Sequence, residues 1–192
     1  MPGFTAPKLL WVLKHEPQII KRIHKVLLPK DCLRDKLSGE AISDRSYSAG
    51  TLWLDTEKRE WSEQMLSATH LSKDQMSTLV EGSELRAELS ADLTREWGLS
   101  SSPVIAGGAG DNAAGAIGMG AVEPENTFLS LGTSGVYLVV QPDLPAKSGS
   151  ASPRLLSLYP EYMASNGSHS QRFQLPELDC RCDPTERIGI YR

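Results

Sequence analysis

Apolar residues recur at helical spacing near the start of the chain. Leu9, Leu10, Val12 and Leu13 fall within Lys8–His15, and five more follow Pro17, at Ile19, Ile20, Ile23, Val26 and Leu27. This spacing predicts one helix over Lys8–His15 and a second over Ile19–Leu27. Pro29 interrupts the pattern. The segment after it predicts a short helix that ends at Gly39, because glycine is common just after the last helical residue.

Between residues 50 and 100, patterns typical of strands alternate with patterns typical of helices. Gly50–Asp55 indicates a short extended segment, and Trp61, Met65 and Leu66 are assigned to the helix after it. Both tryptophans of this stretch are expected in the core. Between positions 71 and 100, the segments DQMSTLVEG and SADLTREWGL predict two more helices, each ended by a glycine. Helices that lead into a buried strand and a glycine turn indicate an α/β domain.

The stretch Ala106–Gly120, AGGAGDNAAGAIGMG, follows an apolar run, Pro103–Ala106, that predicts a buried strand. Gly107–Gly110 allow the backbone to turn with unusual dihedral angles and to approach a ligand closely. Asp111 and Asn112 then begin a helix, where the N–H groups and the helix dipole favour negative charge. Asp111 is either an ionised carboxylate that faces a cleft or only an N-cap after a glycine turn.

A second glycine turn follows 22 residues after Gly110. Phe128–Leu131 and Val136–Val140 predict two strands, joined by the segment Gly132, Thr133, Ser134 and Gly135. Such a turn offers backbone N–H groups and two hydroxyl groups, which suit a phosphate. An ordinary hairpin is the alternative. An acid-bearing glycine turn followed by a Gly-Thr-Ser-Gly hairpin is more specific than either motif alone.

The composition and charge of the chain exclude some classes of function. The chain has 192 residues, of which 40% are hydrophobic and 23% charged, as in a globular protein. The formal net charge of −4 gives no basic surface for nucleic acid or anionic lipid. The three cysteines lack the spacing of a metal site and are typical of a reducing cytoplasm. We find no signal-peptide pattern and no apolar run of membrane-spanning length, so we expect a cytoplasmic protein without membrane or nucleic-acid partners. The oligomeric state is left open.

The two glycine motifs, GGAGDNAAGAIG and FLSLGTSGV, resemble those of the FGGY carbohydrate kinases, in particular their xylulokinase branch. The opening pattern Gly3-x-Thr5-x-x-Lys8-Leu9-x-Trp11 resembles the first signature of that family, and the resemblance runs to about Pro145. It implies part of an α/β, actin-like and hexokinase-like (ribonuclease H-like) ATPase fold, truncated at both ends. We expect residues 1–116 to form the C-terminal part of the first domain and residues 117–146 the opening hairpin of the second.

The resemblance also implies an activity, the ATP-dependent phosphorylation of D-xylulose to D-xylulose 5-phosphate. Asp111 matches the general base of the family, and Asn112 matches a position beside the sugar. The phosphate loop of the second domain matches Gly132, Thr133, Ser134 and Gly135. Mg²⁺ is implied by ATP, although the sequence shows no ligand cluster for it. The 192 residues alone are expected to lack turnover, because the resemblance covers only part of both domains.

Replacements within the matched part leave alternatives open. Tyr47 stands where the family pattern has an acid, Cys32 replaces an expected tyrosine, and Ala109 replaces a glycine. We expect a sugar kinase fragment; the alternatives are an inactive remnant or sugar-binding pseudoenzyme, a kinase for a related sugar or polyol, and an unstable translation product without function. Residues 147–192 hold seven serines, four prolines and two cysteines without sustained periodicity. We predict that this irregular tail is translated out of frame from a break near Ala146–Ser148, the alternative being a flexible extension.

Overall fold

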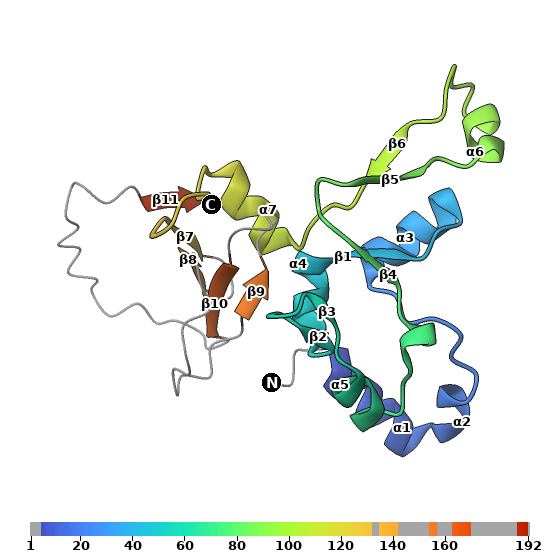
Figure 1. The fold of residues 1–192 in the computed structure, drawn as a ribbon. Coiled ribbons are helices and arrows are strands. Elements are labelled where there is room, and N and C mark those ends of the chain that lie inside the picture. The colour runs from blue at the N-terminus through green and yellow to red at the C-terminus, as the bar shows by residue number, and fades with distance from the viewer. Residues whose placement is uncertain (1–4, 132–134, 142–153, 157–162, 170–187, 192) are drawn as a thin grey trace. The chain divides into compact units, whose positions relative to one another are not determined.

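The chain divides after Ala109 into a first unit, Met1–Ala109, and a second unit, Gly110–Arg192. The computed structural model describes residues 5–131, 135–141, 154–156, 163–169 and 188–191. The helices of the first unit are α1 (Thr5–His15), α2 (Pro17–Ile20), α3 (Pro29–Ser38), α4 (Arg45–Ser48), η1 (Ala49–Thr51), α5 (Glu63–Ala68), η2 (Lys73–Gln75) and α6 (Ala91–Glu96). Its strands are β1 (Ile42–Asp44), β2 (Leu54–Asp55), β3 (Glu60–Trp61), β4 (Thr78–Val80), β5 (Leu85–Glu88) and β6 (Val104–Ala106) (Figure 1).

Two helices of the first unit confirm the predictions from the sequence. The predicted helix over Lys8–His15 is present as α1, and it buries Ala6. Helix α3 begins at Pro29, whose ring fixes a helical φ and whose missing N–H has no helical partner at that position. It ends before Gly39, which takes the left-handed conformation with φ of 79°. Local sequence signals therefore define both ends of α3. Lys30, Asp31 and Arg34 of this helix belong to a buried polar network.

The predicted helix over Ile19–Leu27 is wrong, because α2 ends at Ile20. The next residues form hydrogen bonds to a distant segment instead of helical ones. The backbone N–H of Val26 donates to the carbonyl of Gln75 at 2.8 Å. The ammonium of Lys25 donates to the carbonyls of Asp74 and Met76 at 2.8 and 2.9 Å. Tertiary bonding thus overrides the helical spacing of the apolar residues.

The segment DQMSTLVEG is not a helix either. It forms the short η2 and then β4, which pairs in parallel with β1 in the register Ser43↔Leu79. Thr78 and Val80 are β-branched and fit a strand better than a helix. Trp61 was assigned to the following helix but lies in β3, whereas Met65 and Leu66 do lie in α5. The last predicted helix of this stretch is confirmed as α6.

The core of the first unit consists of two apolar clusters. The larger one surrounds Trp53, which is fully buried and donates its indole N–H to the hydroxyl of Thr69 at 2.9 Å. Its other buried members are Ala6, Leu66, Leu71 and Met76. The smaller cluster joins β1, β4 and β5 through Ile42, Val80 and Ala87. Trp61 packs against the larger cluster, so both tryptophans contribute to the core as expected.

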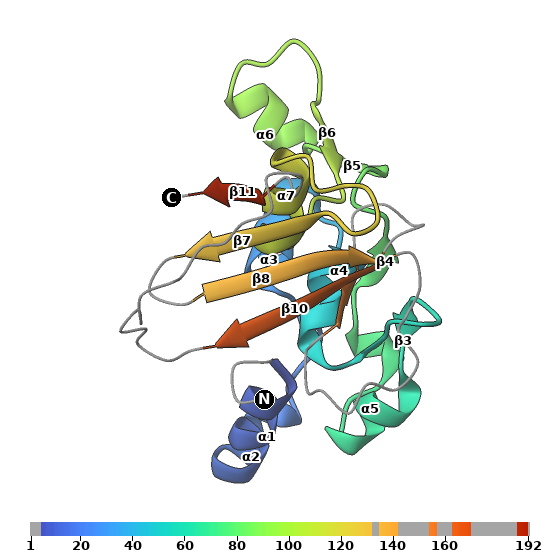
Figure 2. The same ribbon diagram turned by 90° about the vertical axis from the view of Figure 1, so that its left-hand side faces the viewer.

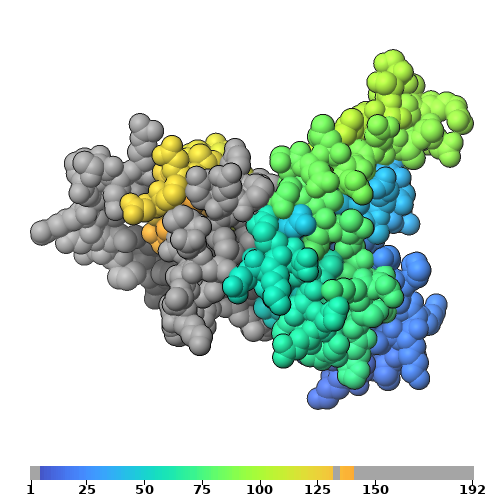
Figure 3. Space-filling model, in the orientation of Figure 1, coloured from blue at the N-terminus to red at the C-terminus, as the bar shows by residue number. Residues whose placement is uncertain are grey.

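Strand β6 is more exposed than the sequence predicted. It pairs antiparallel with β5 alone, and Val104 keeps 52% of its surface exposed. Only Ile105 packs against the smaller apolar cluster. Figure 3 shows β5, β6 and α6 as an arm that stands out from the rest of this unit. The expectation of a buried strand over Pro103–Ala106 is therefore wrong. The ribbon of β5 and β6 packs on the apolar cluster with one face, and its other face stays exposed.

The second unit holds α7 (Asp111–Gly118) and a five-stranded sheet. Its strands are β7 (Thr127–Leu131), β8 (Gly135–Gln141), β9 (Arg154–Leu156), β10 (Met163–His169) and β11 (Ile188–Tyr191), in the order β11-β7-β8-β10-β9. β7, β8 and β10 lie side by side in Figure 2. The antiparallel pairing of β7 and β8, from Thr127↔Val139 to Leu131↔Gly135, confirms the predicted hairpin strands.

Helix α7 packs on this sheet through small residues. Ala116 shares a buried cluster with Ala121, Phe128, Leu138 and Val140. A Cβ on Gly115 would lie 3.4 Å from the ring of Phe128, an ordinary van der Waals distance, so the helix lies close to the sheet at this position. Helix α7 is thereby attached to a hydrophobic core through its second turn.

Three of the described strands, β9, β10 and β11, lie within residues 147–192. Strand β10 pairs antiparallel with β8 from Met163↔Gln141 to His169↔Gly135. The proposal that this tail is read out of frame concerns the gene and stays a prediction. The nucleotide sequence across codons 140–180 is its test.

Candidate active site

Asp111 is the first residue of α7. Gly110, in extended conformation, occupies the N-cap position, so Asp111 is not the N-cap itself. Its carboxylate accepts a hydrogen bond from the backbone N–H of Asn112 at 2.9 Å, and its side chain is exposed. It forms no ion pair with any lysine or arginine in the described part of the chain. An exposed carboxylate at a helix N-terminus is available to accept a proton from a bound hydroxyl group.

The glycine turn before Asp111 is bonded to the segment between β4 and β5. The N–H of Gly107 donates to the carbonyl of Glu84, and the N–H of Gly108 donates to the carbonyl of Gly82, both at 2.9 Å. Gly108 has φ of 76°, which favours glycine. Gly107 lies so close to this segment that a Cβ on it would overlap the carbonyl group of Glu81. Gly107 is therefore required for close backbone packing.

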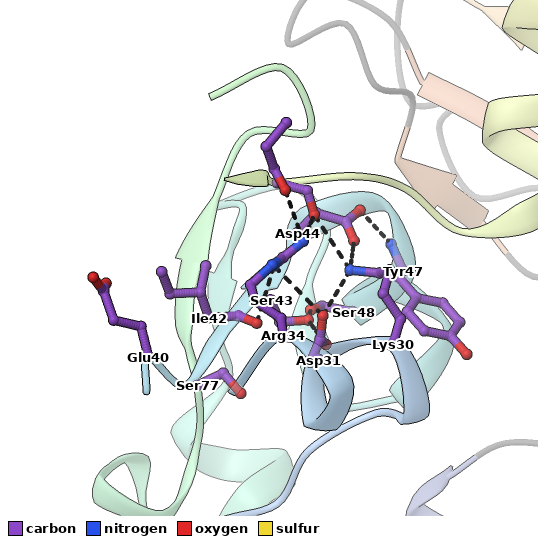
Figure 4. A network of polar contacts seen from close by, with 12 residues as sticks. Lys30, Asp31, Arg34, Glu40, Ile42, Ser43, Asp44, Tyr47, Ser48 and Ser77 are labelled. Atoms are coloured by element: carbon purple, nitrogen blue, oxygen red, sulfur yellow. Dashed lines mark hydrogen bonds and ion pairs between the residues drawn. The ribbon is translucent and has the colours of Figure 1, made fainter. Parts of the chain in front are cut away.

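Beside this turn, side chains from α3, β1 and α4 form a buried polar network. We call it the α3 network (Lys30, Asp31, Arg34, Ser43, Asp44 and Ser48). Asp31 is fully buried, and its Oδ1 lies 2.6 Å from the Lys30 ammonium and 3.7 Å from the Arg34 guanidinium. Its Oδ2 accepts a hydrogen bond from Ser43, whose hydroxyl also contacts that of Ser48 at 2.8 Å. Figure 4 shows these side chains meeting between α3 and β1. Burial of these charges is tolerated because they are paired.

Asp44 is the second fully buried carboxylate of the α3 network. Its Oδ1 lies 2.7 Å from the Lys30 ammonium, and its Oδ2 accepts hydrogen bonds from the Ser46 hydroxyl and from the Tyr47 backbone N–H. The same ammonium lies 5.4 Å from the centre of the Tyr47 ring. Tyr47 therefore lies next to Lys30.

A cavity of about 10 Å³ beside Asp31 and Trp53 holds at most one water molecule and is too small for a sugar.

A Gly107→Ala substitution is expected to destabilise the first unit by about 1–3 kcal/mol or more. The added methyl group would lie 3.0 Å from the Glu81 carbonyl carbon and 3.1 Å from Gly82 Cα, and backbone atoms cannot rotate away. Urea denaturation followed by tryptophan fluorescence measures the loss. The matched control is Gly50→Ala, where a Cβ has no heavy atom within 4 Å. Equal midpoints for the two variants would contradict this packing.

The structure places the predicted site residues as follows. Asp111 and Asn112 open α7, as predicted, and Asn112 is half-buried. Gly135 begins β8 in the same unit. Gly132, Thr133 and Ser134 lie outside the described residues.

Sequence reasoning missed the α3 network. One signal pointed to it, since Lys30-Asp31-x-x-Arg34 places an acid and a base one helical turn apart. The partners contributed by β1 and α4 follow more than ten residues later and are brought together only by the fold.

The described residues contain no group of three or more histidine, cysteine, aspartate or glutamate side chains placed to hold a metal ion. None of the helices in the described ranges has the length and apolar character needed to cross a bilayer.

Comparison with known proteins gives a consistent result. The chain is 56% identical over 151 residues to the xylulose kinase of Escherichia coli K12 and 50% identical over 151 residues to that of Klebsiella pneumoniae. Each match covers 79% of this chain and 31% of the relative. A crystal structure of a xyloylose kinase from Brucella ovis superimposes with a TM-score of 0.85 and 50% identity, over 90% of this chain and 36% of that one.

The chain thus spans about a third of the length of these relatives. Its fold is that of the matching part of the sugar kinases, which have the actin-like ATPase fold, as predicted. The sequence model of the FGGY family of carbohydrate kinases, N-terminal domain, matches residues 1–118, more than half of the chain. The chain therefore belongs to the FGGY family of carbohydrate kinases.

Proposed function

We propose that this chain carries the general base of a kinase that transfers the γ-phosphoryl group of ATP to D-xylulose. The observation that carries the proposal is the exposed Asp111 carboxylate at the first residue of α7, directly after a fixed glycine turn. Support for the substrate comes from the names of the relatives, which are xylulose kinases at 56% and 50% identity.

The proposed step is an in-line displacement. The terminal hydroxyl oxygen of the sugar attacks the γ-phosphorus of ATP, and the bond from that phosphorus to the β,γ-bridging oxygen breaks. The hydroxyl proton passes to the Asp111 carboxylate, and ADP leaves with the bridging oxygen. Asn112 is proposed to orient the sugar, because its amide both donates and accepts hydrogen bonds. The products are D-xylulose 5-phosphate and ADP.

ATP is proposed to contact Gly132, Thr133, Ser134 and Gly135 through its phosphates, as the family resemblance implies. Mg²⁺ bound with ATP neutralises phosphate charge in such reactions. Because the described residues contain no group of metal ligands, we derive no step through the ion. The cytoplasm, where ATP and reduced cysteines are abundant, is the proposed location.

Turnover is tested in a full-length chimaera, in which residues 1–141 replace the matching segment of Escherichia coli xylulose kinase. We expect xylulose-dependent ADP release with kcat in the usual kinase range of about 1–100 s⁻¹. Ribulose, gluconate and glycerol test the alternative of a related substrate by comparison of kcat/KM. The 192 residues alone serve as the control, and we expect no ADP release from them.

A second candidate, a sugar-binding protein without turnover, is favoured by Tyr47. The resemblance places an acid at this position, and the structure shows a phenol beside Lys30 instead. A rise in the melting temperature with D-xylulose but no ADP release would select this candidate, because a ligand stabilises the folded state that binds it. Xylulose-dependent ADP release by the chimaera would exclude it.

A further inference from the structure

The carbonyl groups of the glycine turn are held by side chains from α3. Arg34 is nearly fully buried, and its Nη2 donates to the carbonyl of Ala106 at 2.9 Å and to that of Gly107. Its Nη1 donates to the carbonyl of Ile42 in β1 at 3.2 Å. The Lys30 ammonium donates to Gly107 as well, at 3.3 Å. One guanidinium thus connects β1 with the end of β6 and the start of the turn.

The two sides of the turn are therefore bonded to different segments of the first unit. Its N–H groups donate to Gly82 and Glu84, and its carbonyls accept from Arg34 and Lys30. Backbone groups that are bonded on both sides do not shift without breaking several bonds. The turn is fixed as far as Gly108, and the first unit ends one residue later, at Ala109. Asp111 follows three residues after this fixed point.

Arg34 is itself held by the buried carboxylate of Asp31, at 3.7 Å from Nη1. Its planar guanidinium presents several N–H groups at fixed angles, so it can bind three carbonyls at once. A lysine in its place keeps the positive charge next to Asp31, but its donors all lie on one nitrogen and do not reproduce the planar spacing of the guanidinium. The interaction with the turn therefore depends on the shape of the group in addition to its charge.

We propose that Arg34 is a positioning residue for Asp111. By holding Ala106 and Gly107, it fixes the backbone from which the chain continues to Asp111, four residues after Gly107. This inference rests on the proposed function, in which Asp111 accepts the proton of the sugar. A displacement of about 1 Å in a reacting group lowers a rate by about a hundredfold, so loosening of the turn lowers kcat.

The first test uses amide hydrogen exchange on the 192-residue chain. Arg34→Lys is expected to speed exchange at Gly107 and Gly108 by about tenfold, the effect of losing a charge-assisted hydrogen bond. Lys36→Met is the matched control, because Lys36 is an exposed cation on the same helix. Unchanged exchange at both glycines in Arg34→Lys would overturn the proposal. Arg34→Met extends the test if Arg34→Lys retains part of the bonding.

The second test measures kinetics in the full-length chimaera. Arg34→Lys is expected to lower kcat by about 10- to 100-fold and to change KM for the sugar by less than about threefold. A merely structural role would lower the amount of folded enzyme, which active-site titration detects, and would leave kcat per folded enzyme unchanged. That result would overturn the proposal.

A double-mutant cycle separates this inference from the proposed function. In an Asp111→Asn background, Arg34→Lys is expected to cause no further loss, because the base through which it acts is gone. If the two substitutions lower kcat by factors that multiply in the double mutant, Arg34 acts independently of Asp111. That result would overturn the positioning role of Arg34 and leave the proposed function intact. Parental turnover in Asp111→Asn itself would overturn both the assignment of the base and its positioning by Arg34.

Discussion

Asp111→Asn is expected to lower kcat of the full-length chimaera by about 10²- to 10⁴-fold, the usual contribution of a positioned general base. The amide keeps the size of the carboxylate and still accepts a hydrogen bond from the N–H of Asn112. It does not accept the proton of the sugar hydroxyl at neutral pH, so the transfer loses its base. KM for D-xylulose is expected to stay within a few-fold of the parent value. Steady-state ADP release over a range of sugar concentrations separates these two constants.

Asp92→Asn is the matched control for this substitution. Asp92 is also an exposed aspartate in the first turn of a helix, α6, and it lies 3.5 Å from Arg95. Both exchanges remove a negative charge that favours a helix N-terminus, so both have the same small effect on helix stability. A kcat for Asp111→Asn close to that of Asp92→Asn would remove Asp111 from the mechanism.

Asp31→Asn is expected to lower the free energy of unfolding of the first unit by about 3–5 kcal/mol, as when one partner of a buried ion pair is removed. The amide leaves the buried Arg34 guanidinium without the charge of Asp31, and it leaves the adjacent Lys30 ammonium with one carboxylate, Asp44, in place of two. All four tryptophans lie in the first unit, so their fluorescence reports its unfolding in urea. A shift in the midpoint with an unchanged slope identifies a loss of stability.

The control is the same carboxylate-to-amide exchange at an exposed ion pair, Glu63→Gln. Lys73 lies 2.8 Å from Glu63 and lowers the pKa of that carboxyl group through a hydrogen bond and its charge. Because the pKa is lower in the folded state, this pair stabilises the fold at neutral pH, and the effect is lost as the pH falls through the folded-state pKa. Exposed pairs contribute little, so the midpoint for Glu63→Gln should stay near that of the parent. A similar midpoint for Asp31→Asn would contradict the importance of the α3 network.

The elements that could be predicted from the sequence are those with local signals at their ends. Helix α3 has proline at its first position and Gly39 after its last, and the antiparallel strands β7 and β8 match the two apolar runs that flank the Gly-Thr-Ser-Gly sequence. The glycine stretch before Asp111 likewise marked the start of α7. In each case a proline, which restricts the backbone, or a glycine, which gives it more freedom, lies at the boundary of the element. The boundary is therefore determined by residues that are close together in the sequence.

The remaining features depend on residues far apart in the chain. Ile23 and Val26 have helical spacing, yet their backbone groups bond to Gln75. Arg34 binds the carbonyls of Ala106 and Gly107, more than seventy residues away. No local pattern specifies such partners, because any exposed carbonyl is an equally good acceptor until the fold selects one. The sequence therefore indicated Asp111 as the proposed base, whereas only the structure shows what holds the turn before it.

The hydrogen bonds around the glycine turn also indicate where this chain tolerates engineering. An insertion between Gly107 and Gly108 would pull apart two amides that donate to one short loop, whereas an insertion after Ala109 leaves all of these bonds in place. Tolerance of inserted residues follows the bonding of the backbone at the point of insertion. The peptide bond after Ala109 is thus the place where the Asp111-bearing segment is exchanged between relatives at unchanged length, whereas a linker there would keep the first unit folded but uncouple Asp111 from the turn that Arg34 holds.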